Sequence, residues 1–95
     1  EFMESSYNLP LTLEEISGSV NMSPKYFCRF FHEMTHRTPI DYLNYYRIER
    51  ACYQLITTNL SITEIAYASG FNDLSYFIKT FKKYKGTTPK KYLKI

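Results

Sequence analysis

Hydrophobic residues recur at helical spacing in two stretches of the chain. In the first stretch the positions i, i+3, i+4 and i+7 hold Phe27, Phe30, Phe31 and Met34. In the second stretch the same arc is covered by Leu74, Phe77, Phe81 and Tyr84. This spacing places each row on one side of an α-helix, and we expect both rows to be core. The pattern predicts two amphipathic helices, over about residues 24–35 and 74–85.

Capping residues predict a shorter helix before each of these longer helices. Thr12 is followed three residues later by Glu15, and Ser61 is followed in the same way by Glu64. A hydroxyl with a glutamate three positions on is the capping-box pattern, which marks the start of a helix. We expect the two short helices to begin at these caps and to end near residues 20 and 69.

A tight turn separates each short helix from the longer one. Asn21 and Gly70 are residue types that tolerate the left-handed backbone conformation of such a turn. Ser23 with Pro24, and Asp73 in the second copy, supply N-caps for the longer helices. A short helix, a tight turn and a longer amphipathic helix make up the DNA-binding helix-turn-helix, whose second helix enters the major groove.

The two halves of the chain are repeats of one another. Residues 11–16 recur at 60–65, and after one inserted residue Arg29 matches Lys79 and Phe31 matches Phe81. Two copies are too few for a solenoid, so duplication of one helical unit is the better interpretation. We expect an all-α fold divided as follows: a truncated first helix of an excised fragment in residues 1–10, helix-turn-helix units in 11–39 and 59–95, and a connecting helix in 40–58.

The outward sides of the two longer helices carry side chains suited to DNA. We predict ten DNA-binding residues: Lys25, Tyr26, Cys28, Arg29, His32, Ser75, Tyr76, Ile78, Lys79 and Lys82. Arg29 and Lys79 can donate to guanine O6 and N7, whereas Ile78 and Cys28 can press on a thymine methyl group. Tyr26 and Tyr76 are placed for phosphates, although an exposed tyrosine can equally be a half-buried packing residue.

Composition and charge agree with a folded protein that binds a polyanion. The net charge is +3 and 44% of the residues are hydrophobic. No acidic side chain follows Asp73, whereas lysine recurs from Lys79 to Lys94. A basic segment fits nucleic acid, although lysines are also ordinary solubilising residues. No apolar run is long enough to span a bilayer, so we expect a cytoplasmic, nucleoid-associated protein without membrane contact.

Two metal-site alternatives arise around the end of the first long helix. Residues 32–36 read His-Glu-Met-Thr-His, the H-E-x-x-H pattern of zinc proteases. Such an enzyme needs a third ligand, and only Glu49 or Glu64 can serve as one. Cys28, His32 and His36 also recur at four-residue steps, which allows a surface metal site. We expect coincidence in both cases, and therefore no enzyme activity, no cofactor and no metal.

A third alternative is a helical protein-interaction module without affinity for DNA, because helix pairs also bind partner helices. The cationic faces that recur in both copies favour DNA. Salt dependence separates the two possibilities, since binding that neutralises phosphates weakens steeply as salt rises, whereas binding in an apolar groove does not.

From Leu9 to Ile95 the chain resembles the AraC/XylS family of bacterial transcription regulators. In the second copy the residues that carry the resemblance are 62–71, 75–77, 81–86 and 88–92, and in the first copy they are 13–16, 22–24 and Phe31. The resemblance implies about seven helices, with two helix-turn-helix units tied by a long helix and bound to double-stranded operator DNA as one rigid body.

The resemblance also carries expectations about function. It implies transcription control, usually activation, with effector sensing or dimerisation in a separate domain, and we expect RNA polymerase as a further partner of the intact regulator. By motif position, the base-reading sites of the family fall on Lys25, Cys28, Arg29, Ser75, Tyr76, Ile78 and Lys79. His36 departs from the pattern, because the family usually has glycine there, as this chain has at Gly86. We therefore expect a strained or altered turn at His36.

Overall fold

The computed structural model describes residues 7–8 and 12–93 of the chain, and these residues form helices and no strand. The described helices are α2 (Leu13–Gly18), α3 (Pro24–Thr35), α4 (Pro39–Thr57), α5 (Ile62–Ala68), α6 (Leu74–Lys85) and α7 (Pro89–Leu93). The predicted all-α class is confirmed. The expected first helix lies within residues 1–10, which fall outside the described residues apart from Tyr7 and Asn8.

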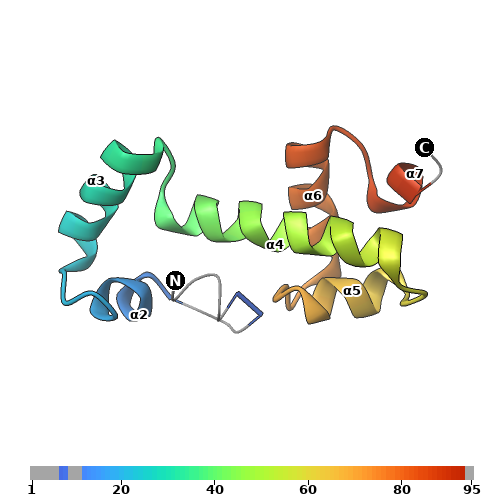
Figure 1. The fold of residues 1–95 in the computed structure, drawn as a ribbon, viewed down its shortest axis with the longest axis horizontal. Coiled ribbons are helices and arrows are strands. Elements are labelled where there is room, and N and C mark those ends of the chain that lie inside the picture. The colour runs from blue at the N-terminus through green and yellow to red at the C-terminus, as the bar shows by residue number, and fades with distance from the viewer. Residues whose placement is uncertain (1–6, 9–11, 94–95) are drawn as a thin grey trace.

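Helix α4 is a long central helix with a helix-turn-helix unit at each end (Figure 1). Helices α2 and α3 lie at one end of α4, and α5, α6 and α7 lie at the other. The ranges predicted for the two longer helices, 24–35 and 74–85, agree with α3 and α6. The domain is elongated, with extents of 42 × 22 × 21 Å along its principal axes.

The N-caps expected from the sequence are confirmed at all four helices. Complete capping boxes are present at α2 and α5, where the hydroxyls of Thr12 and Ser61 each accept a hydrogen bond of 3.1 Å from the main-chain N–H three residues later. The side chains of Ser23 and Asp73 accept main-chain hydrogen bonds at the starts of α3 and α6. Because these bonds satisfy N–H groups that lack a partner inside the helix, they fix where each helix begins.

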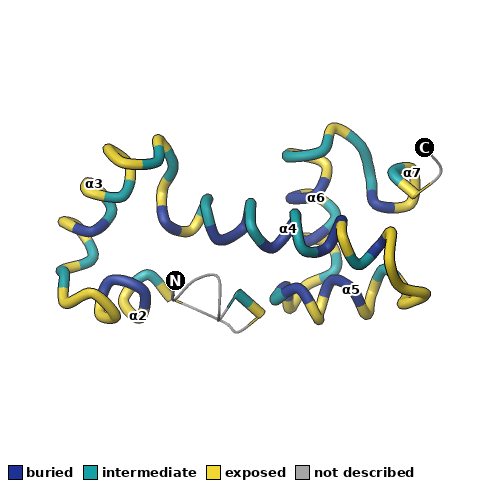
Figure 2. Tube along the Cα trace, in the orientation of Figure 1, coloured by how far each residue is buried: buried dark blue, intermediate teal, exposed yellow. Residues whose placement is uncertain are grey.

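Each unit has its own hydrophobic core, and α4 contributes to both. The smaller core contains Ile16, Phe27 and Leu43. The larger core contains Ile48, Ala51, Cys52, Leu55, Ile65, Ala66, Phe71, Phe77 and Phe81. Buried residues therefore recur along α4, as Figure 2 shows. Burial of apolar surface is the main favourable contribution to folding, so each unit is stabilised by its own core. Helix α4 connects the two units because it contributes residues to both cores.

The prediction that the whole hydrophobic row of α3 is core is wrong for two residues. Phe27 is buried and Phe31 is half-buried, but Phe30 is 43% exposed and Met34 is 68% exposed. Position 30 corresponds in the repeat to Thr80, which is buried in α6 where that helix packs on α4. Phe30 is not part of the smaller core, although α3 also contacts α4.

Both units contain turns in the left-handed backbone region. In the second unit glycine occupies these turns, with φ of 99° at Gly70 and 74° at Gly86. In the first unit the positions are taken by Asn21, with φ of 58°, and by His36, with φ of 62°. The turn at His36 therefore keeps the geometry of its glycine counterpart. A histidine in this region bears a conformational cost that glycine does not, so strain is concentrated at His36.

Candidate DNA-binding surface

The predicted DNA-binding residues of the first unit form a row on the outside of α3. Lys25, Tyr26, Arg29 and His32 are exposed, and Cys28 is half-buried on the flank of the row. The side chains of Lys25, Tyr26 and Arg29, together with the cap residue Ser23, line a shallow hollow of about 160 Å³ at the start of the helix. Two cationic side chains and a phenol thus lie beside the N-terminus of α3, the positive end of the helix dipole, where anions bind favourably.

The predicted DNA-binding residues of the second unit form a similar row on the outside of α6. Ser75, Tyr76, Lys79 and Lys82 are exposed. Ile78 is half-buried and packs against the larger core, so only part of its side chain is available to a partner. Neither row contains a buried residue, which is the first requirement for contact with a groove. The DNA-binding role of the ten residues remains a prediction.

A side chain that sequence reasoning missed connects this row to the central helix. The side-chain amide of Asn44, on α4, donates a hydrogen bond of 2.8 Å to the hydroxyl of Tyr76. Asn44, Tyr76 and Lys79 line a groove of about 340 Å³ between α4 and α6. One signal was available in the sequence, because Asn44 lies one helical turn before Ile48 and so places a polar group in an otherwise buried stripe.

A second polar cluster links the start of α4 to the end of α6. The carboxylate of Asp41 accepts a hydrogen bond from the hydroxyl of Tyr84 and forms ion pairs of 3.5 Å with Arg37 and with Lys83. The Tyr84 hydrogen bond, with the charges of Lys83 and Arg37, lowers the pKa of Asp41 against the opposing effect of burial. Burial, followed by the hydrogen bond to Asp41, raises the pKa of Tyr84. Asp41 therefore stays ionised and Tyr84 stays protonated at neutral pH.

A further ion pair joins the same two helices. The ammonium group of Lys85 lies 2.5 Å from a carboxylate oxygen of Glu49. The hydrogen bond to Glu49 is the main cause that raises the pKa of Lys85, while burial acts in the opposite direction. Because Lys83 and Lys85 are engaged with the carboxylates of Asp41 and Glu49, the exposed lysines of α6 that lie in the predicted DNA-binding row are Lys79 and Lys82.

The H-E-x-x-H segment does not form a metal site in the described structure. His32 is exposed on α3, and His36 occupies the left-handed C-cap position after the helix has ended. Among residues 7–8 and 12–93, no three histidine, cysteine, aspartate or glutamate side chains lie close enough to hold a metal ion. The zinc-enzyme alternative therefore lacks a set of ligands in this part of the chain.

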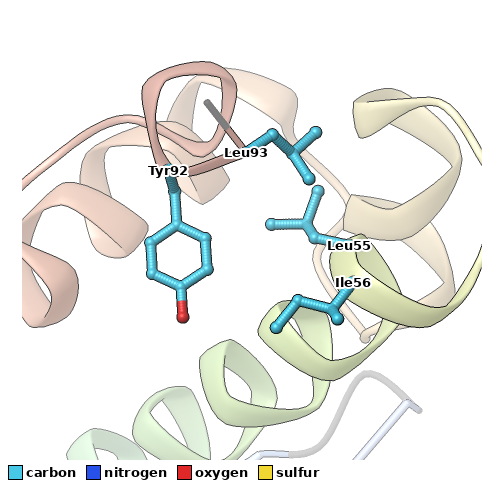
Figure 3. A pocket seen from close by; sticks show the side chains of 4 residues that line it. All are labelled: Leu55, Ile56, Tyr92 and Leu93. Carbon is cyan, nitrogen blue, oxygen red and sulfur yellow. The ribbon is translucent and has the colours of Figure 1, made fainter. Parts of the chain in front are cut away.

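An apolar hollow lies outside the predicted DNA-binding faces of α3 and α6. Leu55 and Ile56 of α4, with Tyr92 and Leu93 of α7, line a space of about 450 Å³ (Figure 3). Ile56 is 70% exposed at its edge. A protein-interaction module would use this apolar hollow as its binding surface. The hollow lies apart from the polar faces that the repeat places on α3 and α6. None of the described helices is both long and apolar enough to cross a membrane.

The duplicated short helix, turn and exposed longer helix define a double helix-turn-helix domain, a class of DNA-binding protein. Residues 16–95 match the family model described as a helix-turn-helix domain. The chain belongs to the DNA-binding domains of the AraC/XylS family of transcription regulators. This confirms the family predicted from the sequence motifs.

Relatives and solved structures agree with this assignment. The HTH-type transcriptional regulator YdeC of Bacillus subtilis is 36% identical over 85 residues, which is 90% of this chain and 29% of YdeC. The C-terminal domain of the two-component response regulator yesN of Fusobacterium nucleatum is 39% identical, with a TM-score of 0.91, covering 97% of this chain and 90% of that one. The chain spans less than half of the length of its curated relatives.

The same fold occurs in a protein solved with DNA. The DNA-binding domain of AdpA, in complex with a target DNA, superimposes with a TM-score of 0.93 at 24% identity, over 98% of this chain and 84% of that one. At this identity the match concerns the fold alone.

Proposed function

We propose that this chain binds double-stranded DNA in a sequence-specific manner and regulates transcription, with α3 and α6 in successive major grooves on one face of the duplex. The observation that carries the proposal is the pair of exposed polar rows that the repeat places at matched positions of α3 and α6. A row of donors on a protruding helix is what reads base edges in the major groove.

The dimensions of the domain support two simultaneous contacts. Successive major-groove sites on one face of DNA are about 34 Å apart. The domain is 42 Å long, and its two helix-turn-helix units lie at opposite ends of α4. A 19-residue helix such as α4 spans about 28 Å, so it acts as a spacer of suitable length. The units of residues 11–39 and 59–95 then bind as two modules joined by residues 40–58.

The proposed roles of the site residues follow from their chemistry. Arg29 and Lys79 donate to guanine, whereas Cys28 and the exposed part of Ile78 contact thymine methyl groups. The other six residues of the predicted site, which are Lys25, Tyr26, His32, Ser75, Tyr76 and Lys82, supply further base and phosphate contacts that set the position of the domain on the duplex. No catalytic step is assigned to any of them.

The wider role is that of the DNA-binding part of a longer regulator. Curated relatives include operon regulatory proteins, and this chain matches only part of each of them. We infer that effector sensing or dimerisation belongs to another domain, that RNA polymerase is a partner and activation the usual outcome, and that the regulator acts in the cytoplasm on nucleoid DNA.

The proposal is tested by selecting bound sequences from a pool of random duplex DNA with the 95-residue chain. We expect an enriched site with two conserved segments about 10 base pairs apart, bound with an affinity that falls steeply as salt increases. A pool without enrichment, or binding that is insensitive to salt, would contradict the proposal. If the chain binds an amphipathic helical peptide and does not bind DNA, the result favours the protein-interaction module.

A further inference from the structure

Three side chains connect the turn after the first recognition helix with the end of the second. Arg37 lies in the turn between α3 and α4, Asp41 lies in the first turn of α4, and Tyr84 is the penultimate residue of α6. The two recognition helices belong to different units with different cores. Because Asp41 belongs to α4, its bond to Tyr84 joins the first turn of α4 to the end of α6, and the ring contact of Arg37 with Tyr84 links the turn after α3 to the second unit.

The contacts engage both oxygens of one carboxylate. The Tyr84 hydroxyl donates to Oδ1 of Asp41 and lies 3.1 Å from the main-chain carbonyl oxygen of the same residue. The guanidinium Nη1 of Arg37 lies 3.5 Å from Oδ2 of Asp41. The same guanidinium stacks over the ring of Tyr45, at 4.3 Å, and approaches the ring of Tyr84, at 5.8 Å. Hydrogen bonding, charge and ring contacts thus converge on one point, which favours a single geometry.

The position of this cluster matters because of how each unit is attached to α4. Phe77 and Phe81 are fully buried in the larger core, so α6 stays attached to α4 without the polar cluster. The first unit packs on α4 through Leu43 and through the ring contact of Tyr42 with Phe31, both close to the start of that helix. The ends of helices are the least stable part of their hydrogen-bond ladder. The angle of the first unit against the second therefore depends on what secures the first turn of α4.

We propose that Arg37, Asp41 and Tyr84 form a clamp that fixes the separation and relative angle of α3 and α6, and that this clamp determines which spacing of half-sites the domain accepts. The inference rests on the proposed function. One inserted base pair moves a half-site by about 3.4 Å and rotates it by about 35° around the duplex axis. A fixed pair of helices cannot follow this change, whereas a pair without the clamp can adjust.

The test compares two variants with the parent chain on a series of duplexes. Tyr84→Phe removes one hydroxyl and keeps the ring, and Asp41→Ala removes the central carboxylate. Tyr92→Phe is the matched control, because it removes the hydroxyl of another half-buried tyrosine outside the clamp. The DNA probes are the duplex selected from the random pool and versions of it with one or two base pairs inserted or deleted between the two conserved segments.

We expect the parent and Tyr92→Phe to lose at least about tenfold in affinity for a single inserted base pair, as for a lost base contact. In Tyr84→Phe and Asp41→Ala the same insertion should cost less than about threefold. Variants that keep the parental spacing profile, or that bind every duplex more weakly by one common factor, would overturn the clamp and leave the proposed function intact.

A second measurement on the free protein separates failure of the clamp from failure of DNA binding. Residual dipolar couplings should fit one common alignment for both units of the parent, and two different alignments in Tyr84→Phe and in Asp41→Ala. Identical alignment of the two units in the parent and in both variants would overturn the clamp even if the selected duplex is bound. If no duplex is selected from the pool, the proposed function fails and the role of the clamp in choosing spacing fails with it.

Discussion

The side-chain amide of Asn44 donates a 2.8 Å hydrogen bond to the hydroxyl of Tyr76, across the contact between α4 and α6. Asn44 is buried, whereas Tyr76 is 47% exposed on the second recognition helix. The ring of Tyr76 also packs near that of Phe71, with 6.0 Å between the ring centres. The tyrosine is therefore held in one orientation before any DNA is bound, with its hydroxyl hydrogen free to donate to a phosphate oxygen.

This arrangement predicts that Asn44→Ala weakens DNA binding without changing sequence preference. Loss of one hydrogen bond that orients Tyr76 should reduce affinity by about 0.5 to 1.5 kcal/mol, equally for the selected duplex and for a scrambled one, since phosphates carry no sequence information. Fluorescence anisotropy with both duplexes measures the effect. Asn59→Ala, at an exposed loop position, is the control. A change in the ratio of the two affinities would mean that Tyr76 reads a base.

Replacement of the central donor of each recognition row should affect specificity. Arg29→Ala and Lys79→Ala are each expected to weaken binding to the selected duplex by about 1 to 3 kcal/mol and to relax discrimination at different base pairs. Affinities for a set of single-base-pair variants of the duplex give both quantities. The two rows occupy different units, so the positions that become tolerant should fall in different half-sites.

Lys90→Ala provides the control for these two variants, because Lys90 is an equally exposed cation that lies on α7. It should lower affinity for all duplexes slightly, through the general attraction of positive charge to DNA. If Arg29→Ala and Lys79→Ala behave like Lys90→Ala, the two rows do not read bases, and α3 and α6 face the duplex with other residues.

The left-handed turn at His36 predicts a stabilising substitution. His36→Gly should increase the free energy of unfolding by about 1 kcal/mol, because glycine adopts the observed φ of 62° without the steric cost borne by histidine. Gly86→Ala, at the matching turn of the second unit, should have the opposite sign. Urea unfolding followed by far-UV circular dichroism measures both, and a neutral or destabilising His36→Gly would indicate that the imidazole makes a compensating contact.

Features that depend on neighbouring residues were predictable from the sequence. The cap at Ser23, with Pro24 after it, and the cap at Asp73 determined where the recognition helices begin, because capping is decided within one turn of the helix. The exposure of Arg29 and Lys79 followed from helical periodicity alone. These local signals were sufficient to define the class of fold and the candidate faces.

Features that depend on packing between distant segments were not predictable. Phe30 and Thr80 occupy equivalent positions in the repeat, yet the aromatic residue is exposed and the hydroxyl residue is buried. Helices α3 and α6 both contact α4, so the difference between these equivalent positions depends on details of packing that the repeat does not carry. The contact between Asp41 and Tyr84 joins residues 43 positions apart, and no periodicity relates them.

The environment of Asp41 predicts how stability depends on pH. Tyr84 and Lys83 from α6, and Arg37 from the preceding turn, face this carboxylate and lower its pKa below the ordinary value of 3.8. A carboxyl group with a lowered pKa in the folded state stabilises the fold above its unfolded pKa, and this contribution is lost as the pH falls through the folded pKa. The parent should therefore exceed Asp41→Asn in stability by a constant amount at neutral pH, and the difference should shrink progressively below pH 3.8.

Urea unfolding of the parent and of Asp41→Asn across this pH range tests the expectation, and a carbon-detected NMR titration reports the carboxyl group directly. The hydrogen bond from Tyr84 is the largest cause of the lowered pKa, so in Tyr84→Phe the Asp41 pKa should move up toward its ordinary value. Tyr92→Phe should leave the titration unchanged. An Asp41 carboxyl that titrates identically in the parent and in Tyr84→Phe would show that the hydroxyl does not engage it in solution, and that α6 is fastened to the start of α4 by charge and packing alone.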